Sequence, residues 1–184
     1  MLSLVAPPQV EPVSVEFAKR HIGVFGSSQD DYIGALVAAA RERAENICER
    51  AFVAATWERR VAEFSERIRL YRTPIASIES MSYRPAAAAS LADRLEIAAA
   101  SLAVSQHGGH IEMASGASWP DGSDIIIRFT TGPIEMVPSS VCAAICMIAA
   151  DLYNNREESV VGTTRSDNPA VMNLLSPFML GDRV

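Results

Sequence analysis

Two stretches in the first third of the chain carry apolar residues every three to four positions, the spacing of an amphipathic helix. Residues 14–24 predict a short helix with Ser14 as its N-cap. Residues 28–50 predict a long helix that begins with Ser28 and Asp31 at capping-box spacing. Its apolar residues form one stripe, so we expect that stripe to face a core. The charged residues that lie away from the stripe are Arg41, Glu42, Arg43 and Glu45.

The last third predicts two further helices. Pro138 is placed to open a helix over residues 139–154, which are apolar on almost every side. A helix of this composition is normally buried. The polar residues 157–169 predict a loop, and residues 170–179 predict a short helix with apolar residues at helical spacing.

Between these helices, apolar and polar residues alternate, which is typical of strands with one buried face. Turn residues such as Thr73-Pro74, Gly108-Gly109 and Asp121-Gly122 separate the alternating runs, so we expect short antiparallel strands. The Ala-rich residues 86–100 fit no single element. The expected strands are 56–61, 68–71, 75–83, 102–104, 111–113 and 125–131.

Together these elements predict an α+β protein. Its helical core is a long helix from the N-terminal half and a buried helix from the C-terminal half, with an antiparallel β-rich insertion at about residues 53–132. We expect a single domain over residues 14–158, followed by a mobile loop and a C-terminal docking helix over residues 159–184. Residues 1–13 predict an extended N-terminal arm, because their prolines oppose helix formation and sheet pairing. These prolines are Pro7, Pro8 and Pro12.

Composition narrows the class of protein. The chain has 184 residues, 21% of them charged, and a formal net charge of −6. That balance is typical of a folded protein and lacks the basic excess of a nucleic-acid-binding domain. Three cysteines predict no disulfide framework, which fits assembly in a reducing cytoplasm. No apolar run reaches the length of a membrane span, and the N-terminal residues lack the pattern of a signal peptide.

The sequence contains few residues in the patterns that catalytic, cofactor-binding or metal sites require. The phosphate-binding, dinucleotide-binding, zinc-protease and serine-hydrolase motifs are missing from the sequence. Two histidines, His107 and His110, flank a glycine turn, and the neighbouring Glu112 could be a third metal ligand. A hairpin turn with solvated histidines explains this pattern better than a metal site. Cys142 and Cys146 lie one helical turn apart in the most apolar helix, where we expect them to pack as small apolar side chains. The sequence therefore predicts a non-enzymatic protein with no cofactor.

The remaining polar and aromatic candidates have ordinary structural explanations. We expect one tryptophan, Trp57, to pack under the sheet and the other, Trp119, to anchor a loop. The paired carboxylates lack a basic partner or a histidine nearby in sequence, so they are interpreted as solvated surface charge. These carboxylates are Asp121, Asp124, Glu157 and Glu158.

The order of the elements carries a resemblance. A long capped helix is followed by Thr56-Trp57-Glu58 and by a strand pair around Pro74, and a later strand ends at Thr130-Thr131-Gly132. Val137-Pro138 then opens an apolar helix that ends with residues 151–157, Asp-Leu-Tyr-Asn-Asn-Arg-Glu. Over about residues 14–180 this order resembles the tailed-phage head–tail connector (adaptor) family, whose members also occur in prophages and gene transfer agents.

The resemblance implies a structural role. Such subunits form a homo-oligomeric ring, with twelve-fold symmetry expected, beneath the portal at the head–tail junction of a virion or gene-transfer-agent particle. The ring extends the channel for double-stranded DNA, which passes without sequence-specific binding, and it offers a platform for a neck, stopper or tail-completion protein. The expected partners are therefore the portal protein, the next neck or tail protein and further copies of this chain, assembled in the bacterial host cytoplasm without a membrane.

The partner interface is placed, as a hypothesis, on apolar residues near the C-terminus and on the end of the apolar helix. These residues are Leu174, Leu175, Phe178, Met179, Leu180, Tyr153, Arg156 and Glu157. Three alternatives stay open at this point: a different neck or tail-completion protein such as a stopper, a small α+β enzyme or ligand-binding protein, and a cytoplasmic scaffold unrelated to phage.

Overall fold

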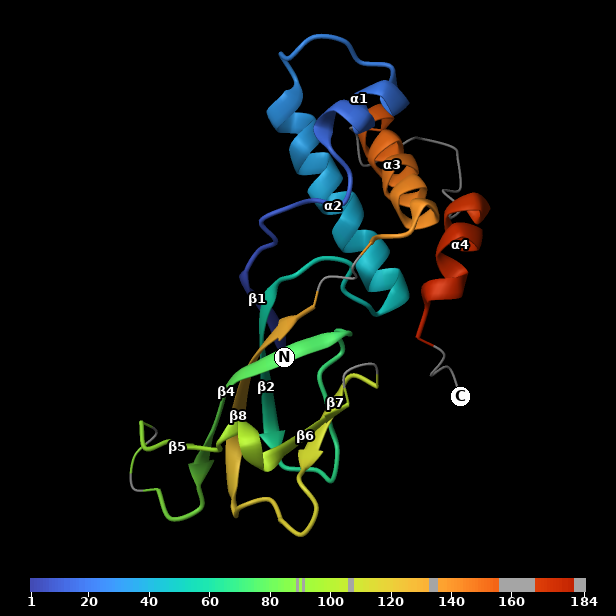
Figure 1. Cartoon of the computed structure of the whole chain (residues 1–184). Helices are drawn as coiled ribbons and strands as arrows, with labels where there is room; N and C mark the ends of the chain where they lie inside the picture. Colours follow the sequence, from blue (N-terminus) through green and yellow to red (C-terminus); the bar gives the residue numbers. More distant parts are fainter. Residues whose placement is uncertain (89, 91, 106–107, 133–135, 156–167, 181–184) are drawn as a thin grey trace, which may run out of the picture. The chain divides into compact units, whose positions relative to one another are not determined.

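The structure is a computed structural model that describes residues 1–88, 90, 92–105, 108–132, 136–155 and 168–180. Its helices and antiparallel sheets confirm the predicted α+β class (Figure 1). The chain divides into two compact units, which we call the β-unit and the helical unit. The β-unit is Met1–Gln9 with Val53–Ile134, and the helical unit is Val10–Phe52 with Glu135–Val184.

Two antiparallel sheets build the β-unit. The five-stranded sheet has the order β1-β2-β8-β4-β5, and the three-stranded sheet has the order β3-β7-β6. The strands of the larger sheet are β1 (Leu2–Ala6), β2 (Thr56–Glu63), β8 (Gly122–Thr131), β4 (Ile75–Pro85) and β5 (Leu95–Glu96). Those of the smaller sheet are β3 (Ile68–Arg69), β7 (His110–Met113) and β6 (Leu102–Ser105), which follows a 3-10 turn at Ala99–Ser101.

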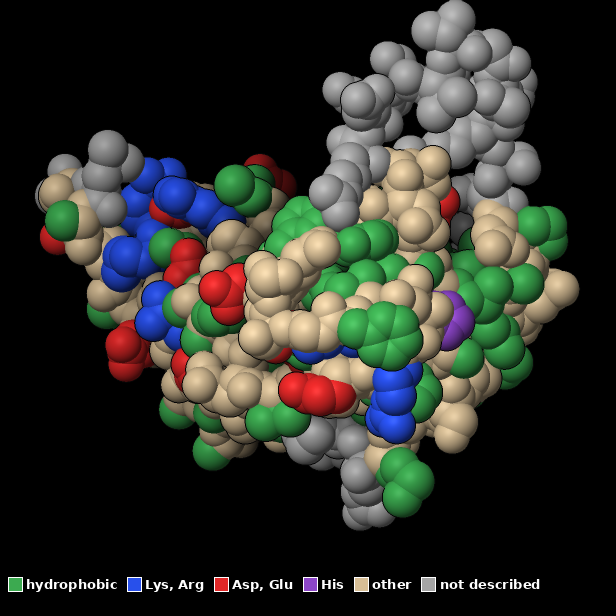
Figure 2. Space-filling model, turned by 90° about the horizontal axis from the view of Figure 1, so that it is seen from above, with side chains coloured by type: hydrophobic (Ala, Val, Ile, Leu, Met, Phe, Trp, Pro, Cys, Tyr) green, Lys and Arg blue, Asp and Glu red, His purple; other side chains and the backbone are tan. Residues whose placement is uncertain are grey.

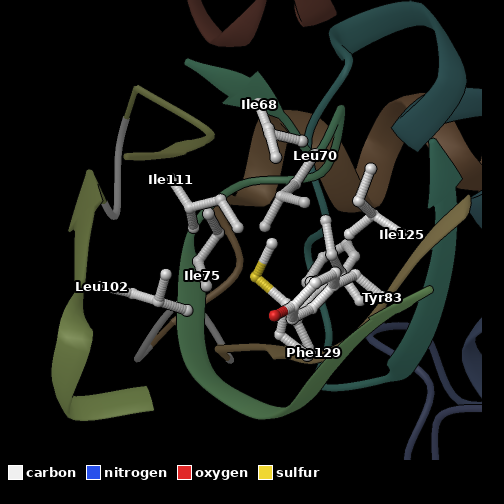
Figure 3. Packing of buried hydrophobic residues seen from close by; sticks show 10 residues of the cluster. Ile68, Leu70, Ile75, Tyr83, Leu102, Ile111, Ile125 and Phe129 are labelled. Atoms are coloured by element: carbon white, nitrogen blue, oxygen red, sulfur yellow. The ribbon is translucent and has the colours of Figure 1, made fainter. Parts of the chain in front are cut away.

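The core of the β-unit is shared by residues of both sheets. Central strand β8 buries Ile125, Ile127 and Phe129 and turns the residues between them to its other face, as the period of two in a strand requires. Side chains from β3, β4, β6 and β7 complete the cluster (Figure 3). The buried members from these strands and their connections are Ile68, Leu70, Ile75, Met81, Tyr83, Leu102 and Ile111.

The first residues of the chain differ from the prediction. Residues 2–6 form β1, which pairs antiparallel with β2, so Leu2 lies opposite Arg59 and Leu4 opposite Trp57. The expectation that this stretch avoids sheet pairing is wrong for residues 2–6. The physical reason is that the prolines begin only at Pro7, so every N–H of residues 2–6 remains available for the ladder.

The described residues of the helical unit form the helices α1 (Val15–Ile22), α2 (Asp30–Cys48), α3 (Ser139–Asn154) and α4 (Pro169–Leu175), which continues into a 3-10 turn at Ser176–Phe178. Ser14 caps α1 as predicted, because its hydroxyl accepts a hydrogen bond from the N–H of Phe17 at 3.2 Å. The predicted capping box of α2 is not formed; its N-cap is Gln29, which makes no side-chain cap bond. Asn168 caps α4 through the N–H of Ala170 at 3.0 Å.

Small and branched apolar side chains fill the helical unit. Helix α3 packs against α1, α2 and α4, which explains why its sequence is apolar on nearly every side. Its side chains Val141, Ile145 and Ile148 are buried, and α2 contributes Ile33 and Val37 to the same interior. In the part of the chain that the structure describes, no helix combines the length and the apolar composition that a membrane crossing requires.

Candidate assembly surfaces

The predicted C-terminal interface residues fall into two groups. Leu175 is fully buried among the helices of its own unit, where its carbonyl lies 3.8 Å from the Cys48 thiol, so it is a core residue in this structure. Leu174, Phe178, Met179 and Leu180 are partly exposed and are therefore still available as contacts. The N–H of Leu180 donates to the carbonyl of Cys48 at 3.2 Å, which holds this stretch against the end of α2.

The remaining predicted interface residues lie at the end of α3. Tyr153 is partly buried, and its hydroxyl donates to Oε1 of Gln29 at 2.9 Å. Its ring also contacts Tyr32, with the centroids 6.2 Å apart. Arg156 and Glu157 lie outside the residues that the structure describes. Tyr153 therefore ties α3 to the start of α2 within its own unit.

Apolar side chains lie exposed around the connection between α1 and α2. Phe17 on α1 is 49% exposed, Tyr32 at the start of α2 is 40% exposed, and Phe25 between them is 92% exposed. The guanidinium of Arg20 lies 5.7 Å from the centre of the Phe17 ring. Figure 2 looks down on this end of the helical unit and shows apolar side chains gathered there. Exposed aromatic residues in such a group are typical of protein contacts.

A buried ion-pair network lies within the helical unit, where the sequence pattern placed its members away from the buried stripe. Arg41 and Glu45 are only 3% and 2% exposed, so that interpretation is wrong for both. Arg41 donates to Glu11 and to Glu45, each at 2.8 Å, and Glu45 also accepts from the N–H of Phe52 at 2.8 Å. The carboxylates raise the pKa of Arg41, against the opposing effect of its desolvation.

The network binds α2 to the segments at the start and end of residues 10–52. Glu11 belongs to the residues that enter the helical unit, and Phe52 is its last residue before the chain passes to β2. The Arg41–Glu45 pair on α2 therefore binds the segment before α1, through Glu11, and the segment after α2, through the N–H of Phe52. Both hydrogen bonds are charge-assisted. Sequence periodicity missed the pair because α2 is covered by these connections as well as by other helices.

A second polar cluster lies on the face of the five-stranded sheet that is turned away from the core. Asp124 on β8 accepts from Arg60 on β2 at 2.9 Å and from Arg94, before β5, also at 2.9 Å. These hydrogen bonds, that from Arg60 foremost, hold the pKa of Asp124 at about 2. The reading of Asp124 as a solvated charge without basic partners is therefore wrong. Its partners come from distant parts of the sequence, and its φ of 54° is a conformation that Asp tolerates better than most residues.

A shallow hollow of about 520 Å³ adjoins this cluster and is lined by Arg60, Ala62, Glu63, Arg84, Ser123 and Asp124. Arg84 donates to the Ser123 hydroxyl at 3.3 Å. Across the same sheet face, Arg128 pairs with Glu58 at 2.9 Å, and Ser77 and Thr130 share a hydrogen bond of 2.7 Å. Arginines, hydroxyls and carboxylates that already pair with one another make this a polar surface. The Ser123 hydroxyl accepts from Arg84 there.

The third cluster stacks arginines on aromatic rings at one side of the β-unit. The guanidinium of Arg59 lies 4.2 Å from the centre of the Tyr71 ring, and that of Arg69 lies 5.3 Å from the same ring. Arg72 stacks on Trp57 at 4.9 Å. We call these five residues the arginine–aromatic cluster. Sequence reasoning missed it, because β2 and the residues after β3 meet only in the folded chain.

The described residues weighed for metal binding, His110 and Glu112, contact other groups of the chain. His107 lies outside the described residues, Nδ1 of His110 lies 3.3 Å from the Gly108 carbonyl, and Glu112 pairs with Arg67 at 3.3 Å. Within the described ranges, the structure groups no three His, Cys, Asp or Glu side chains around a possible metal position.

The cysteines are packed rather than reactive. Cys48 and Cys146 are buried and Cys142 is half-buried. Desolvation raises the pKa of Cys48 to about 11 and also raises the pKa of Cys142 and Cys146. Such thiols stay protonated at neutral pH and are poor nucleophiles. Trp119 also behaves as predicted, since it stacks on Phe64 with ring centres 5.0 Å apart and fixes its loop.

No protein-family model and no curated protein matches the chain. Solved structures do match it along its whole length. A chain from the neck of an empty gene transfer agent (GTA) particle, computed with C6 symmetry, aligns with a TM-score of 0.73 at 19% identity over 100% of both chains. A chain from the virion of a native GTA particle aligns with a TM-score of 0.73 at 20% identity, again over 100% of both chains.

A chain from the neck of a native GTA particle, computed with C12 symmetry, gives a TM-score of 0.72 at 19% identity over 100% of both chains. The chain therefore shares its fold with components of GTA particles. Because the alignment covers both chains completely, the likeness includes the β-unit and the helical unit alike.

Proposed function

We propose that this chain is a structural head–tail connector subunit, an adaptor that forms a ring beneath the portal of a phage-type or GTA particle. The observation that carries the proposal is the full-length fold likeness to chains from GTA necks and virions. The order of sequence elements, Val137-Pro138 and its apolar helix above all, points to the same family.

The surfaces of the chain support an assembly role rather than a catalytic one. A closed ring needs head-to-tail contacts, so each subunit must present two different adhesive surfaces. The β-unit offers the arginine–aromatic cluster, and the helical unit offers exposed aromatic residues around Phe25. Leu174, Phe178 and Leu180 remain candidates for contact with the portal or with the next neck protein.

The charge of the chain suits a channel through which DNA moves. Its net charge of −6 disfavours tight binding of DNA phosphates, which carry the same sign. The arginines on the open sheet face, Arg60, Arg94 and Arg128, are already paired with carboxylates. DNA would therefore pass such a ring without sequence-specific contacts.

Deleting the gene in a strain that makes the particles tests this function. We expect heads and tails to accumulate separately, because the platform that joins them is missing, and a plasmid copy of the gene to restore complete particles. Complete, tailed particles made without this chain would contradict the proposal.

A further inference from the structure

We propose that the arginine–aromatic cluster is the contact by which one copy of this chain binds the acidic helical unit of the next copy in the ring. The inference rests on the proposed ring function and adds to it a specific surface and its occupant. The cluster consists of Trp57, Arg59, Arg69, Tyr71 and Arg72.

The composition of the cluster is that of an interface centre. Trp, Tyr and Arg are the residues most enriched among those that dominate binding energy at protein interfaces. Tyr71 is 44% exposed although two guanidinium groups lie on its ring. Stacking fixes these side chains before binding, so little side-chain entropy remains to be lost when a partner arrives.

Two polar groups in the cluster have no acceptor among the described residues. Nε of Arg59 and Nε1 of Trp57 are buried and make no hydrogen bond in the part of the chain that the structure describes. A buried N–H donor without an acceptor is destabilising and uncommon in folded proteins. These two donors lie in the same cluster as the exposed ring of Tyr71.

The backbone conformation of Tyr71 also indicates that the cluster is functional. Tyr71 has a φ of 61°, in the left-handed region that bulky residues rarely adopt. Such strain persists where the surrounding structure enforces it, and it is concentrated at functional positions. Here it places an aromatic ring between Arg59 and Arg69 at the surface.

Charge complementarity selects the occupant. In the helical unit, acidic residues outnumber basic ones by 13 to 8, whereas in the β-unit the numbers are 9 and 8. Exposed carboxylates of the helical unit include Glu16 on α1 and Asp31 and Glu42 on α2. A basic cluster on one unit and an acidic surface on the other are the two different surfaces that a head-to-tail ring contact requires.

Photo-crosslinking in purified particles identifies the partner directly. A photoreactive phenylalanine derivative replaces Tyr71, the particles are irradiated, and the crosslinked peptides are identified by mass spectrometry. We expect a crosslink to residues 10–52 or 136–180 of a second copy of this chain. A crosslink to another protein, a crosslink to DNA or no crosslink would overturn the proposal.

Charge reversal provides a second, independent readout. We expect Arg59→Glu and Tyr71→Ala to lower the amount of this chain in particles about tenfold or more, as loss of an interface centre predicts. Tyr71→Phe keeps the stacked ring and should be incorporated normally. Arg67→Glu is the matched control, since Arg67 lies in the same unit, is 65% exposed and lies outside the cluster.

The two failures can be told apart. If the unmodified chain is missing from purified particles, the connector function itself is wrong. If the chain is present and Arg59→Glu is incorporated as well as Arg67→Glu, the connector function stands and only the assignment of this surface is wrong. Each soluble variant is checked for an unchanged thermal transition before incorporation is measured.

Discussion

At the scale of single residues, the buried Arg41–Glu45 pair contributes to the stability of the helical unit through hydrogen bonds to the chain around it. Both residues are nearly inaccessible, and together they bind Glu11 and the N–H of Phe52. Removing Glu45 leaves Arg41 with Glu11 and the N–H of Phe52 buried without an acceptor, and removing Arg41 leaves the carboxylate of Glu45 buried without its cation, so either change costs more than the net contribution of the intact pair.

We predict that Glu45→Ala lowers the free energy of unfolding by about 3 kcal/mol, because Arg41 loses its buried acceptor and keeps Glu11, while the buried N–H of Phe52 loses the acceptor Glu45. Denaturant unfolding of the purified chain measures this loss. Glu42→Ala is the comparison, since Glu42 lies on the same helix and reaches Arg41 only at 3.6 Å with 54% of its side chain exposed, so its loss should cost less than about 1 kcal/mol. A loss of less than about 1 kcal/mol for Glu45→Ala, the scale of an exposed ion pair, would contradict the network.

Asp124 predicts a pH dependence with a definite sign. Its pKa is about 2 in the folded chain, below the usual value of 3.8, because Arg60 and Arg94 donate to its carboxylate. A carboxyl with a lowered folded pKa stabilises the fold above its unfolded pKa, and this contribution is lost as the pH falls. We therefore expect wild type to melt above Asp124→Asn at neutral pH and the difference to shrink between about pH 5 and pH 2. A difference that is independent of pH would contradict this assignment.

At this scale, the sequence predicted features that depend on neighbouring residues and did not predict contacts between residues far apart in the chain. The N-cap of Ser14 and the packing of Cys146 depend on neighbouring residues and helical spacing, and both are as predicted. Arg60 meets Asp124 and Arg59 meets Tyr71 only because β2 is placed beside other segments of the fold, and pairing between strands depends on a register that no single stretch of sequence contains.

At the scale of elements, α3 is the centre of the helical unit. Its near-uniform apolar composition predicted burial, and α1, α2 and α4 cover it. We expect Ile148→Asp to abolish soluble folding, because Ile148 is 3% exposed and a carboxylate there would have no partner. Expression and thermal melting of the variant test this. Ser139→Asp, at the exposed first turn of the same helix, should fold normally, since a negative charge is favourable there. A soluble, cooperatively melting Ile148→Asp variant would show that α3 is not the core.

Helix α4 requires a revision of the docking hypothesis. Val171 and Leu175 are buried, so deleting residues 170–184 would remove part of the core and would not leave an intact domain. We predict that Leu175→Ala lowers the free energy of unfolding by about 2–5 kcal/mol, as large-to-small core changes do. Leu174→Ala, one position away and partly exposed, should cost clearly less. Equal effects of the two substitutions would contradict the packing of α4, and denaturant unfolding distinguishes the outcomes.

The elements themselves were largely predictable. The helices over residues 139–154 and 14–24 and the strand over residues 125–131 carry strong periodic patterns, and each is present within a few residues of its expected bounds. Two strands, β1 and β5, were missed. Both lie at the edges of the sheet, and β5 is a two-residue strand whose Ala-rich surroundings offer no alternation to read.

At the scale of the whole molecule, two units of different character recur together along the full length of chains from GTA particles. The units also differ in charge, since most of the acidic excess lies in the helical unit. Neither property identifies a catalyst, and both suit a subunit that repeats around an axis by binding copies of itself. The order of the sequence elements resembles that of the connector family, while the surfaces proposed to join the copies became visible only in the folded chain.

A connector ring of this chain beneath the portal can be looked for in assembled particles. Cryo-electron microscopy of purified particles, focused on the portal vertex without imposed symmetry, tests it most directly. We expect a closed ring of this chain in direct contact with the portal, with Tyr71 of each copy against the helical unit of its neighbour. A vertex at which another protein occupies that position, with this chain further along the neck or missing from the particle, would contradict it.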